Sequence, residues 1–328
     1  MKRFLYLICV LALASTAIAR LGTARRIAAP AAVVAGGGGT LLLDETGLGS
    51  AAAAYAVNKL RAAYSGYFVR IRRSSDNAEA DFGDDGTGWI TSSSVAANGS
   101  NPILDGQSLA TFFLAVNGFV VTAYNQSGSA TGNATQRSAS YQPQIVSSGS
   151  LVTQNGVPAM LADSTSALTA TNLTLTAQTV MLVWRGTTAG MLVETGAGGS
   201  ANDFYIYGTT DASTSIARSS IRSSKNLSAS WANSADHRLI EQYHNGTHAS
   251  IHLFIDNADQ SLTTYSSQSG NIGTTSTTGT LNILSRNNGA SLQSQGYLSL
   301  LVIWSSDLND AGTRSTAAAN INAAYALY

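Results

Sequence analysis

The sequence predicts a mainly β fold: a two-sheet sandwich with a few short helices, one of them at the C-terminus. Three observations lead there. Strand-like runs recur at roughly 8–20 residue intervals from Val152 onward, with turn residues between them. Asn245-Gly246, flanked by two such runs, is a strong hairpin signal. The chain is rich in Ser, Thr and Gly, and only 11% of its residues are charged, which is typical of β proteins whose small polar side chains face water.

The individual strands follow from alternation and from β-branched or aromatic content. Tyr67 to Arg73 alternates strictly, and Phe119 to Tyr124 is a short apolar run. Asp256-Asn257 marks a further turn. The later predicted strands are Leu173–Leu175, Val180–Trp184, Asp203–Tyr207, Arg238–Tyr243, Ala249–Ile255, Leu281–Leu284 and Tyr297–Trp304.

Three segments predict helices. Ala51 to Tyr64 contains neither Gly nor Pro and spaces its large apolar residues at close to helical intervals. A short helix is expected from Asp105 to about Val116, with Gly118 as its stop signal. Asp310 to Tyr328 predicts a closing helix, since Ile321 and Tyr325 lie one turn apart.

The N-terminus reads as a leader and a linker ahead of one domain. Lys2 and Arg3 precede an apolar run, and Ala17-Ile18-Ala19 follows it, as in a secretory signal peptide over residues 1–19. The alternative is a short apolar anchor that stays on the chain. Residues 20–40 are rich in Gly and Ala and predict a linker, which leaves residues 41–328 as the sandwich domain. Cys9, the single cysteine, lies inside the apolar run. Cleavage after residue 19 would remove both, so the processed chain is expected to have no thiol and no membrane span.

Composition excludes several classes of protein. The 18 basic and 18 acidic side chains balance, so the chain lacks the basic excess of a nucleic-acid binder. With four Glu and three Lys it is no coiled coil. No phosphate-binding Gly-rich loop and no Gly-x-Ser-x-Gly elbow occurs. Because the chain has no net charge and few charged residues, we expect an extracellular protein whose surface makes contacts through neutral side chains.

A glycoside hydrolase needs two carboxyl groups across a cleft, and a sugar-binding surface needs exposed rings. The candidate carboxylates are Asp203, Glu194 and Glu241, and the candidate sugar platform is Tyr205, Tyr207 and Trp231. Trp184 and Trp304 lie in apolar strands and are expected in the core.

Metal sites are weaker alternatives. The loop that carries Asp81, Asp84 and Asp85 could hold calcium, but its spacing does not match an EF-hand, and a solvated turn is the favoured interpretation. The nearby Arg70, Arg72 and Arg73 are expected to neutralise these acids rather than to bind phosphate. His244, His248 and His252 are spaced four apart, but the Asn245-Gly246 turn argues against one helical metal face. No cofactor is expected apart from this calcium.

Three stretches resemble a known family. Tyr55 to Gly66 with Val69 to Asp76 is similar to the opening of the catalytic domain of fungal-type α-L-arabinofuranosidase B. Thr122 to Gly128 resembles that family's Tyr-Asp-Gln-Ser-Gly segment, and Ala319 to Tyr325 resembles its closing helix. The resemblance covers roughly residues 50–328 and implies a concanavalin A-like (jelly-roll) sandwich.

The resemblance also places the family's functional residues. The counterpart of the nucleophilic Glu falls at Asp203, and the counterpart of the general acid falls at Asn287, whose amide cannot act as an acid. The catalytic pair is therefore expected to be broken, with Asn287 left as a sugar-binding amide.

Leu41 to Asp44 after the Gly-rich lead resembles uncharacterised proteins of tailed bacteriophages, in which such sandwiches are surface modules. The leading hypothesis is a non-catalytic module on a virion surface, as a head-fibre, decoration or tail protein, or otherwise extracellular. It would bind glycans or the host surface and contact other virion proteins or copies of itself. The alternatives are a secreted arabinofuranosidase-like hydrolase and a purely structural decoration protein.

Overall fold

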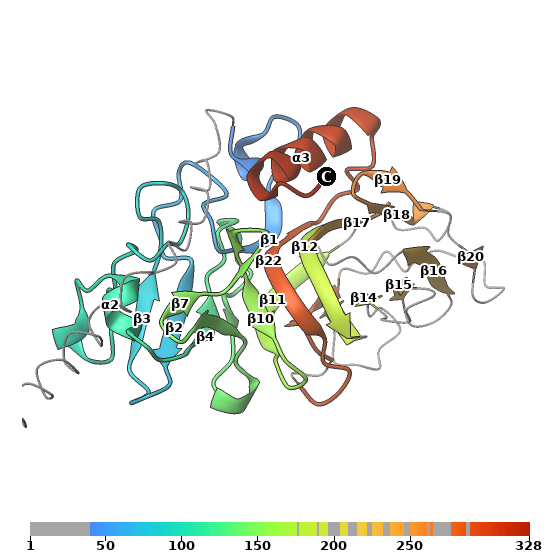
Figure 1. Ribbon diagram of the computed structural model, residues 1–328. Helices are drawn as coiled ribbons and strands as arrows, with labels where there is room; N and C mark the ends of the chain where they lie inside the picture. The colour runs from blue at the N-terminus through green and yellow to red at the C-terminus, as the bar shows by residue number, and fades with distance from the viewer. Residues whose placement is uncertain are drawn as a thin grey trace, which may run out of the picture. The chain divides into compact units, whose positions relative to one another are not determined.

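The structure is a computed structural model that describes residues 40–175, 177–188, 190–195, 204–208, 215–221, 225–231, 237–245, 250–260, 263–264, 277–286 and 289–328. It is mainly β, as predicted, and all its major ladders are antiparallel (Figure 1). The expected N-terminal leader lies outside the described residues. Within the described part of the chain, no helix is long and apolar enough to cross a membrane.

The first array of strands is built around β22, the long strand near the C-terminus. Strands β1 and β10 pair along one edge of β22, and β12 pairs along the other and leads to β17, β18 and β19. The members are β1 (Ala51–Ala56), β10 (Met160–Ala162), β22 (Gln295–Trp304), β12 (Gln178–Thr188), β17 (Arg238–His244), β18 (His252–Ile255) and β19 (Ala258–Asp259).

The second array runs across the other layer, each strand paired with the next. In spatial order it contains β3 (Glu79–Phe82), β2 (Val69–Arg73), β4 (Gly118–Ala123), β5 (Ala134–Thr135), β11 (Leu168–Leu175), β21 (Thr277–Ile283), β13 (Gly190–Thr195), β14 (Phe204–Gly208), β15 (Ser215–Ile221), β16 (Lys225–Trp231) and β20 (Thr263–Thr264).

Short elements link and edge the arrays. Strand β6 (Gln144–Ser147) pairs with both β4 and β10 and so joins the two arrays, and β7 (Ser150–Leu151) extends it. Strands β8 (Thr153–Gln154) and β9 (Val157–Pro158) form a separate hairpin. The 3₁₀ turns are η2 (Leu42–Asp44), η3 (Pro102–Leu104) and η4 (Ala139–Tyr141).

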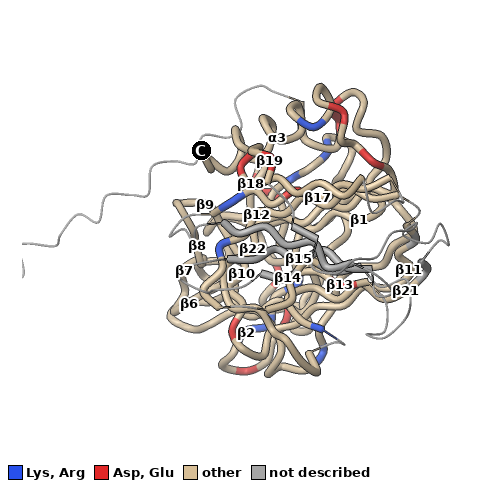
Figure 2. The backbone as a smooth tube through the Cα atoms, turned by 90° about the vertical axis from the view of Figure 1, so that its right-hand side faces the viewer, with Lys and Arg blue, Asp and Glu red and all other residues tan. Residues whose placement is uncertain are grey.

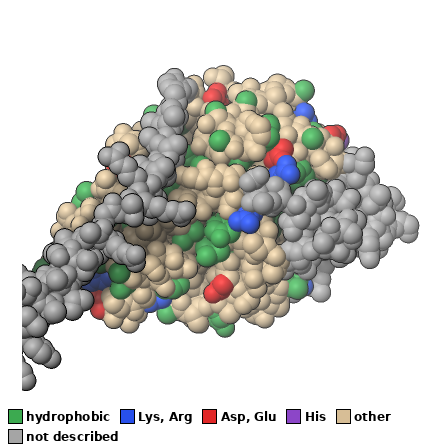
Figure 3. Space-filling view, viewed as in Figure 1, with side chains coloured by type: hydrophobic (Ala, Val, Ile, Leu, Met, Phe, Trp, Pro, Cys, Tyr) green, Lys and Arg blue, Asp and Glu red, His purple; other side chains and the backbone are tan. Residues whose placement is uncertain are grey.

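One apolar core fills the sandwich. Trp304 and Trp184 are buried in it, as predicted. Charged residues are sparse along the backbone (Figure 2), and the face seen in Figure 3 is mostly uncharged, with one small hydrophobic patch near its middle. Burial of apolar surface is the main stabilising contribution in such a fold.

The C-terminal helix is confirmed as α3 (Ala311–Tyr325). The Asp310 side chain caps it by accepting a hydrogen bond from the Thr313 amide at 2.9 Å. Ala317, Ala318, Ile321 and Tyr325 form its buried face. In Figure 1 it lies above β17 and β18.

The predicted helix over residues 51–64 is wrong. Ala51 to Ala56 is strand β1, almost wholly buried and paired with β22 from Ala51–Trp304 to Ala56–Leu300. Alanine is the strongest helix former, but intrinsic helix propensity is a weak determinant, and pairing within a buried sheet overrides it here.

The second helix is shorter than predicted. It is α2 (Leu109–Phe113), capped by Ser108, and it ends at Leu114, whose φ is +47°. Gly118, expected as its stop signal, opens β4 instead. The Asp256-Asn257 turn is confirmed, since both residues have positive φ.

Candidate functional site

The second array carries one unbroken row of polar residues across ten strands. Each member stands directly opposite the next in the antiparallel register, and directly paired residues project on the same face of a sheet. From β3 to β16 the row is Asp81, Arg70, Thr122, Thr135, Thr169, Asn282, Glu194, Tyr205, Ser220 and Asn226. We call it the polar row.

The polar row lies on the face opposite the core. The adjacent register positions are apolar and buried: Val193 pairs with Ile283, and Ile283 pairs with Leu168. Because successive side chains of a strand point to opposite faces, the members of the row from Asp81 to Glu194 face away from these residues.

This face is more than a solvated surface. Glu194, Asn282 and Asp81 are all buried, whereas Thr122, Thr135 and Thr169 between them are partly exposed. Burying a carboxylate or an amide costs free energy unless it is paired. The row therefore combines buried polar side chains, which have partners within the protein, with threonine hydroxyls that are accessible to a ligand.

Glu194 is the buried carboxylate at the centre of one group of hydrogen-bonded side chains. Its Oε1 accepts from Arg286 Nε at 2.9 Å, and its Oε2 accepts from Asn282 Nδ2 at 3.3 Å. The Glu194 side chain is 1% exposed and that of Arg286 is 30% exposed. The charge of Glu194 is thus neutralised while one edge of the guanidinium reaches the surface.

Arg286 is held in place by the turn that follows β21. Its amide donates to the Ser291 carbonyl at 2.9 Å, and the Gly289 amide donates to Ser285 Oγ at 3.0 Å. Gly289 has φ +88°, a conformation that favours glycine. This turn fixes the side chain that faces Glu194.

Glu241 belongs to another environment. It lies in β17, in the other array, where Tyr243 Oη donates to its Oε2 at 2.5 Å. Arg314 of α3 lies over the ring of Phe254, the residue opposite Glu241 in the register. Burial raises the pKa of Glu241 to about 7. Glu194 and Glu241 are therefore set in separate layers, and Glu241 is covered by the C-terminal helix.

The remaining predicted site residues are described only in part. Asp203 and Asn287 lie outside the described residues. Tyr205, Tyr207 and Trp231 are placed along strands β14 and β16, while their side chains lie outside what the structure describes. Tyr205 occupies the register position opposite Glu194, so two predicted site residues are neighbours.

The predicted neutralisation of the acidic loop is confirmed for two ion pairs. Arg70 binds Asp81 through Nε and Nη2, both at 2.8 Å, and Tyr124 Oη donates to the same carboxylate at 2.6 Å. Arg73 pairs with Asp76 at 2.6 Å.

The weak metal candidates form no cluster in the described part of the chain, where no group of three or more His, Cys, Asp or Glu could hold a metal ion. Asp84 Oδ1 accepts from the amides of Gly86 and Gly88 in a turn. Tyr243 stands opposite His252, so His244 and His252 lie on neighbouring strands, and His248 falls outside the described residues.

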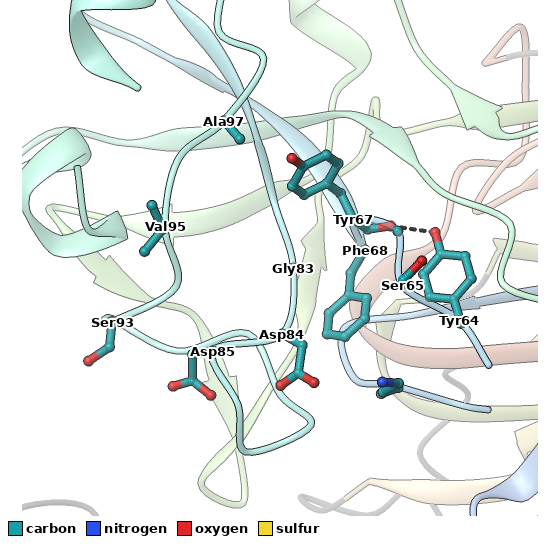
Figure 4. A pocket seen from close by; sticks show the side chains of 12 residues that line it. Tyr64, Ser65, Tyr67, Phe68, Gly83, Asp84, Asp85, Ser93, Val95 and Ala97 are labelled. Carbon is teal, nitrogen blue, oxygen red and sulfur yellow. Dashed lines mark hydrogen bonds between the residues drawn. The ribbon is translucent and has the colours of Figure 1, made fainter. Parts of the chain in front are cut away.

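A pocket of about 530 Å³ opens near the ends of β2 and β3 (Figure 4). Its lining includes Lys59, Tyr64, Tyr67, Asp84 and Ser93. The sequence predicted no binding role for the two tyrosines, because Tyr64 fell in a predicted helix and Tyr67 in a predicted strand. The signal available was Tyr-Ser-Gly-Tyr, an aromatic pair around a turn.

Comparisons with solved structures agree with this architecture. A GH54 α-L-arabinofuranosidase soaked with a cyclic sulfate inhibitor is similar with a TM-score of 0.59 at 17% identity, over 84% of this chain. An arabinofuranosidase complexed with arabinofuranosyl-alpha-1,2-xylobiose gives a TM-score of 0.59 at 16% identity, also over 84% of this chain. This chain shares their β-sandwich fold. The similarity spans 63% of each of those chains.

No protein-family model matches the sequence, and no curated protein matches it. At such low identity the structural similarity establishes the fold, and function has to be argued from the polar row itself.

Proposed function

We propose that this chain is a non-catalytic glycan-binding module whose polar row forms the binding face. The observation that carries the proposal is the row itself, with paired buried groups and open hydroxyl positions on the non-core face. Sugars present alternating donors and acceptors, which hydroxyl, amide and guanidinium groups can match. The proposal is supported by the similar fold of an arabinofuranosidase that was solved in complex with arabinofuranosyl-alpha-1,2-xylobiose.

Binding is favoured over hydrolysis by the chemistry of the residues present. A retaining or inverting glycosidase uses two carboxyl groups, one of which must give up a proton. Here the resemblance puts an amide, Asn287, at the acid position. Glu194 is paired with Arg286 at 2.9 Å, and such a pair orients donors around the row. Glu241 lies in the other layer.

Display on a virion or another extracellular surface is part of the same proposal. It is supported by the signal-like N-terminus and by a surface poor in charge. Contacts with other virion proteins or with copies of the chain are expected there. The intact mass of the purified protein tests processing: a mass that begins at Met1 contradicts secretion through a cleaved signal.

A glycan array combined with a hydrolysis assay tests the function. We expect the intact protein to bind a defined group of glycans and to leave a chromogenic arabinofuranoside uncleaved. An array without a single bound glycan would favour a structural decoration role, and arabinofuranoside cleavage above the buffer blank would establish an enzyme.

A further inference from the structure

The pocket near the ends of β2 and β3 adjoins one end of the polar row, since Ala97 in its lining pairs with Asp81, but none of its lining residues belongs to the row. It has features of a binding site of its own. Its volume, about 530 Å³, falls within the roughly 300–1,000 Å³ typical of ligand sites. Figure 4 shows side chains from two segments, residues 59–68 and 83–97, around the same space.

The two segments are tied together, so the pocket is preformed. Lys59 N donates to the Gly88 carbonyl at 2.8 Å, and Phe68 N donates to the Phe82 carbonyl at 2.8 Å. Ser94 Oγ donates to the Gly83 carbonyl at 2.8 Å. A preformed pocket loses little conformational entropy when a ligand binds.

The aromatic wall is fixed by its own contacts. Tyr64 Oη donates to the Tyr67 carbonyl at 2.6 Å, and its ring stacks on Phe68 at 6.5 Å. A Cβ at Gly66 would lie 2.7 Å from Tyr64 Oη, so a glycine is needed to seat this ring. Tyr67 is partly exposed and lines the pocket.

Polar groups around the pocket keep hydrogen-bonding capacity. Asp84 Oδ1 accepts two backbone hydrogen bonds, whereas Asp84 Oδ2 has no partner among the described residues. The same holds, within the described part of the chain, for Lys59 Nζ, Tyr67 Oη and Ser93 Oγ. One acceptor, one cation and two hydroxyls thus surround one space.

The rim supplies apolar surface. Val95 lines the pocket and is 54% exposed. A ligand that fits must offer a hydrophobic face for Tyr67 and Val95 and an edge of hydroxyls for Asp84 and Lys59. Saccharides have this two-sided character, since their C–H faces stack on aromatic rings while their hydroxyls hydrogen-bond.

We propose that this pocket is a second saccharide-binding site, distinct from the polar row, that holds a neutral sugar residue against Tyr67 and between Asp84 and Lys59. A neutral ligand fits because Asp85 is already held by hydrogen bonds from Thr87 and Thr91. The charges left to meet a ligand are then one carboxylate, Asp84, and one lysine, Lys59, which together favour neither a strong anion nor a simple cation.

Saturation-transfer NMR with the full chain tests the proposal. The probes are methyl glycosides of glucose, galactose, mannose, N-acetylglucosamine and arabinofuranose. We expect at least one to bind, Tyr67→Ala to abolish its signal, and Asp84→Asn to weaken its affinity about tenfold. Asp84→Asn is informative because an amide oxygen can still accept from Gly86 and Gly88, so the turn is kept and the free oxygen is changed.

Matched variants separate this site from the row and from general damage. Tyr328→Ala removes another exposed tyrosine, and Asp259→Asn removes another exposed carboxylate; both should bind as wild type does. The double variant Thr122→Val/Thr135→Val alters the row alone. Retained binding in Tyr67→Ala, loss of binding only in the row variant, or a signal with methylammonium but with none of the glycosides would overturn the proposal.

Discussion

Tyr243 donates a 2.5 Å hydrogen bond to Glu241, and both side chains are fully buried. The carboxyl has a second oxygen, Oε1, without a hydrogen-bond partner in the described structure. Burial raises the pKa of Glu241 to about 7, although the hydrogen bond from Tyr243 favours the charged form. Between pH 4.5 and pH 7 the Glu241 carboxyl therefore keeps its proton in the folded protein and releases it in the unfolded chain.

This pair predicts a stability that falls as pH rises. The folded-state pKa of about 7 lies above the ordinary 4.5. The contribution of Glu241 to the free energy of unfolding is therefore complete below pH 4.5 and is lost by pH 7. The loss is about 3 kcal/mol. In urea unfolding at pH 4.5 to 8, Glu241→Gln should lack this slope and exceed wild type at pH 8. Parallel curves for both proteins would refute the assignment.

His237 predicts the opposite slope. It is buried, its Nε2 lies 3.4 Å from Ser299 Oγ, and burial together with Arg185 lowers its pKa from 6.5 to about 4. The unfolded chain binds the proton first, so stability present above pH 6.5 is lost as pH falls toward 4. His237→Gln should flatten the unfolding free energy between pH 6 and pH 4, and an unchanged acid limb would contradict this.

The Glu194–Arg286 pair predicts strong coupling. Arg286→Ala leaves a buried carboxylate without its cation, and we expect a loss of about 2 kcal/mol, below the 3–5 kcal/mol of fully buried pairs because Arg286 is 30% exposed. Glu194→Gln in the same background should restore most of that loss. Additive losses in a urea double-mutant cycle would show that the two side chains do not interact.

Leu114 predicts a gain in stability. It has φ +47° and ψ −114°, which L residues adopt at a cost, and its side chain is 72% exposed. Leu114→Gly relieves the strain while losing little packing, so the unfolding free energy should rise by about 1 kcal/mol. Ile103→Gly, at another exposed position, is the control and should not stabilise. A destabilised Leu114→Gly protein would show that no strain is present.

Strands with local signals could be predicted from the sequence. Arg238 to His244 and Gln295 to Trp304 carry β-branched or aromatic runs bounded by turn residues, and both are strands. The C-terminal helix could be predicted because the one-turn spacing of Ile321 and Tyr325 is a local signal, and both residues lie on its buried face. In these elements local preference and tertiary packing agree.

The misassigned and missed features depend on long-range contacts. Ala51 to Ala56 is a strand because β22, some 250 residues later, pairs with it, and no local pattern encodes that partner. The Glu194–Arg286 contact joins residues 92 positions apart. The pocket required Tyr64 and Asp84 to be brought together by the packing of two loops.

The binding role of the polar row is tested most directly by calorimetric titration of the strongest array glycan into wild type and into Thr122→Val/Thr135→Val. The structure gives neither hydroxyl a partner among the described residues, so the isosteric change should leave stability intact while each lost hydrogen bond costs about fivefold in affinity. Thr153→Val, at an exposed position outside the row, is the control. We expect the Kd to rise at least tenfold in the double variant and to stay unchanged in the control. An unchanged Kd in the double variant would show that the polar row does not bind the glycan.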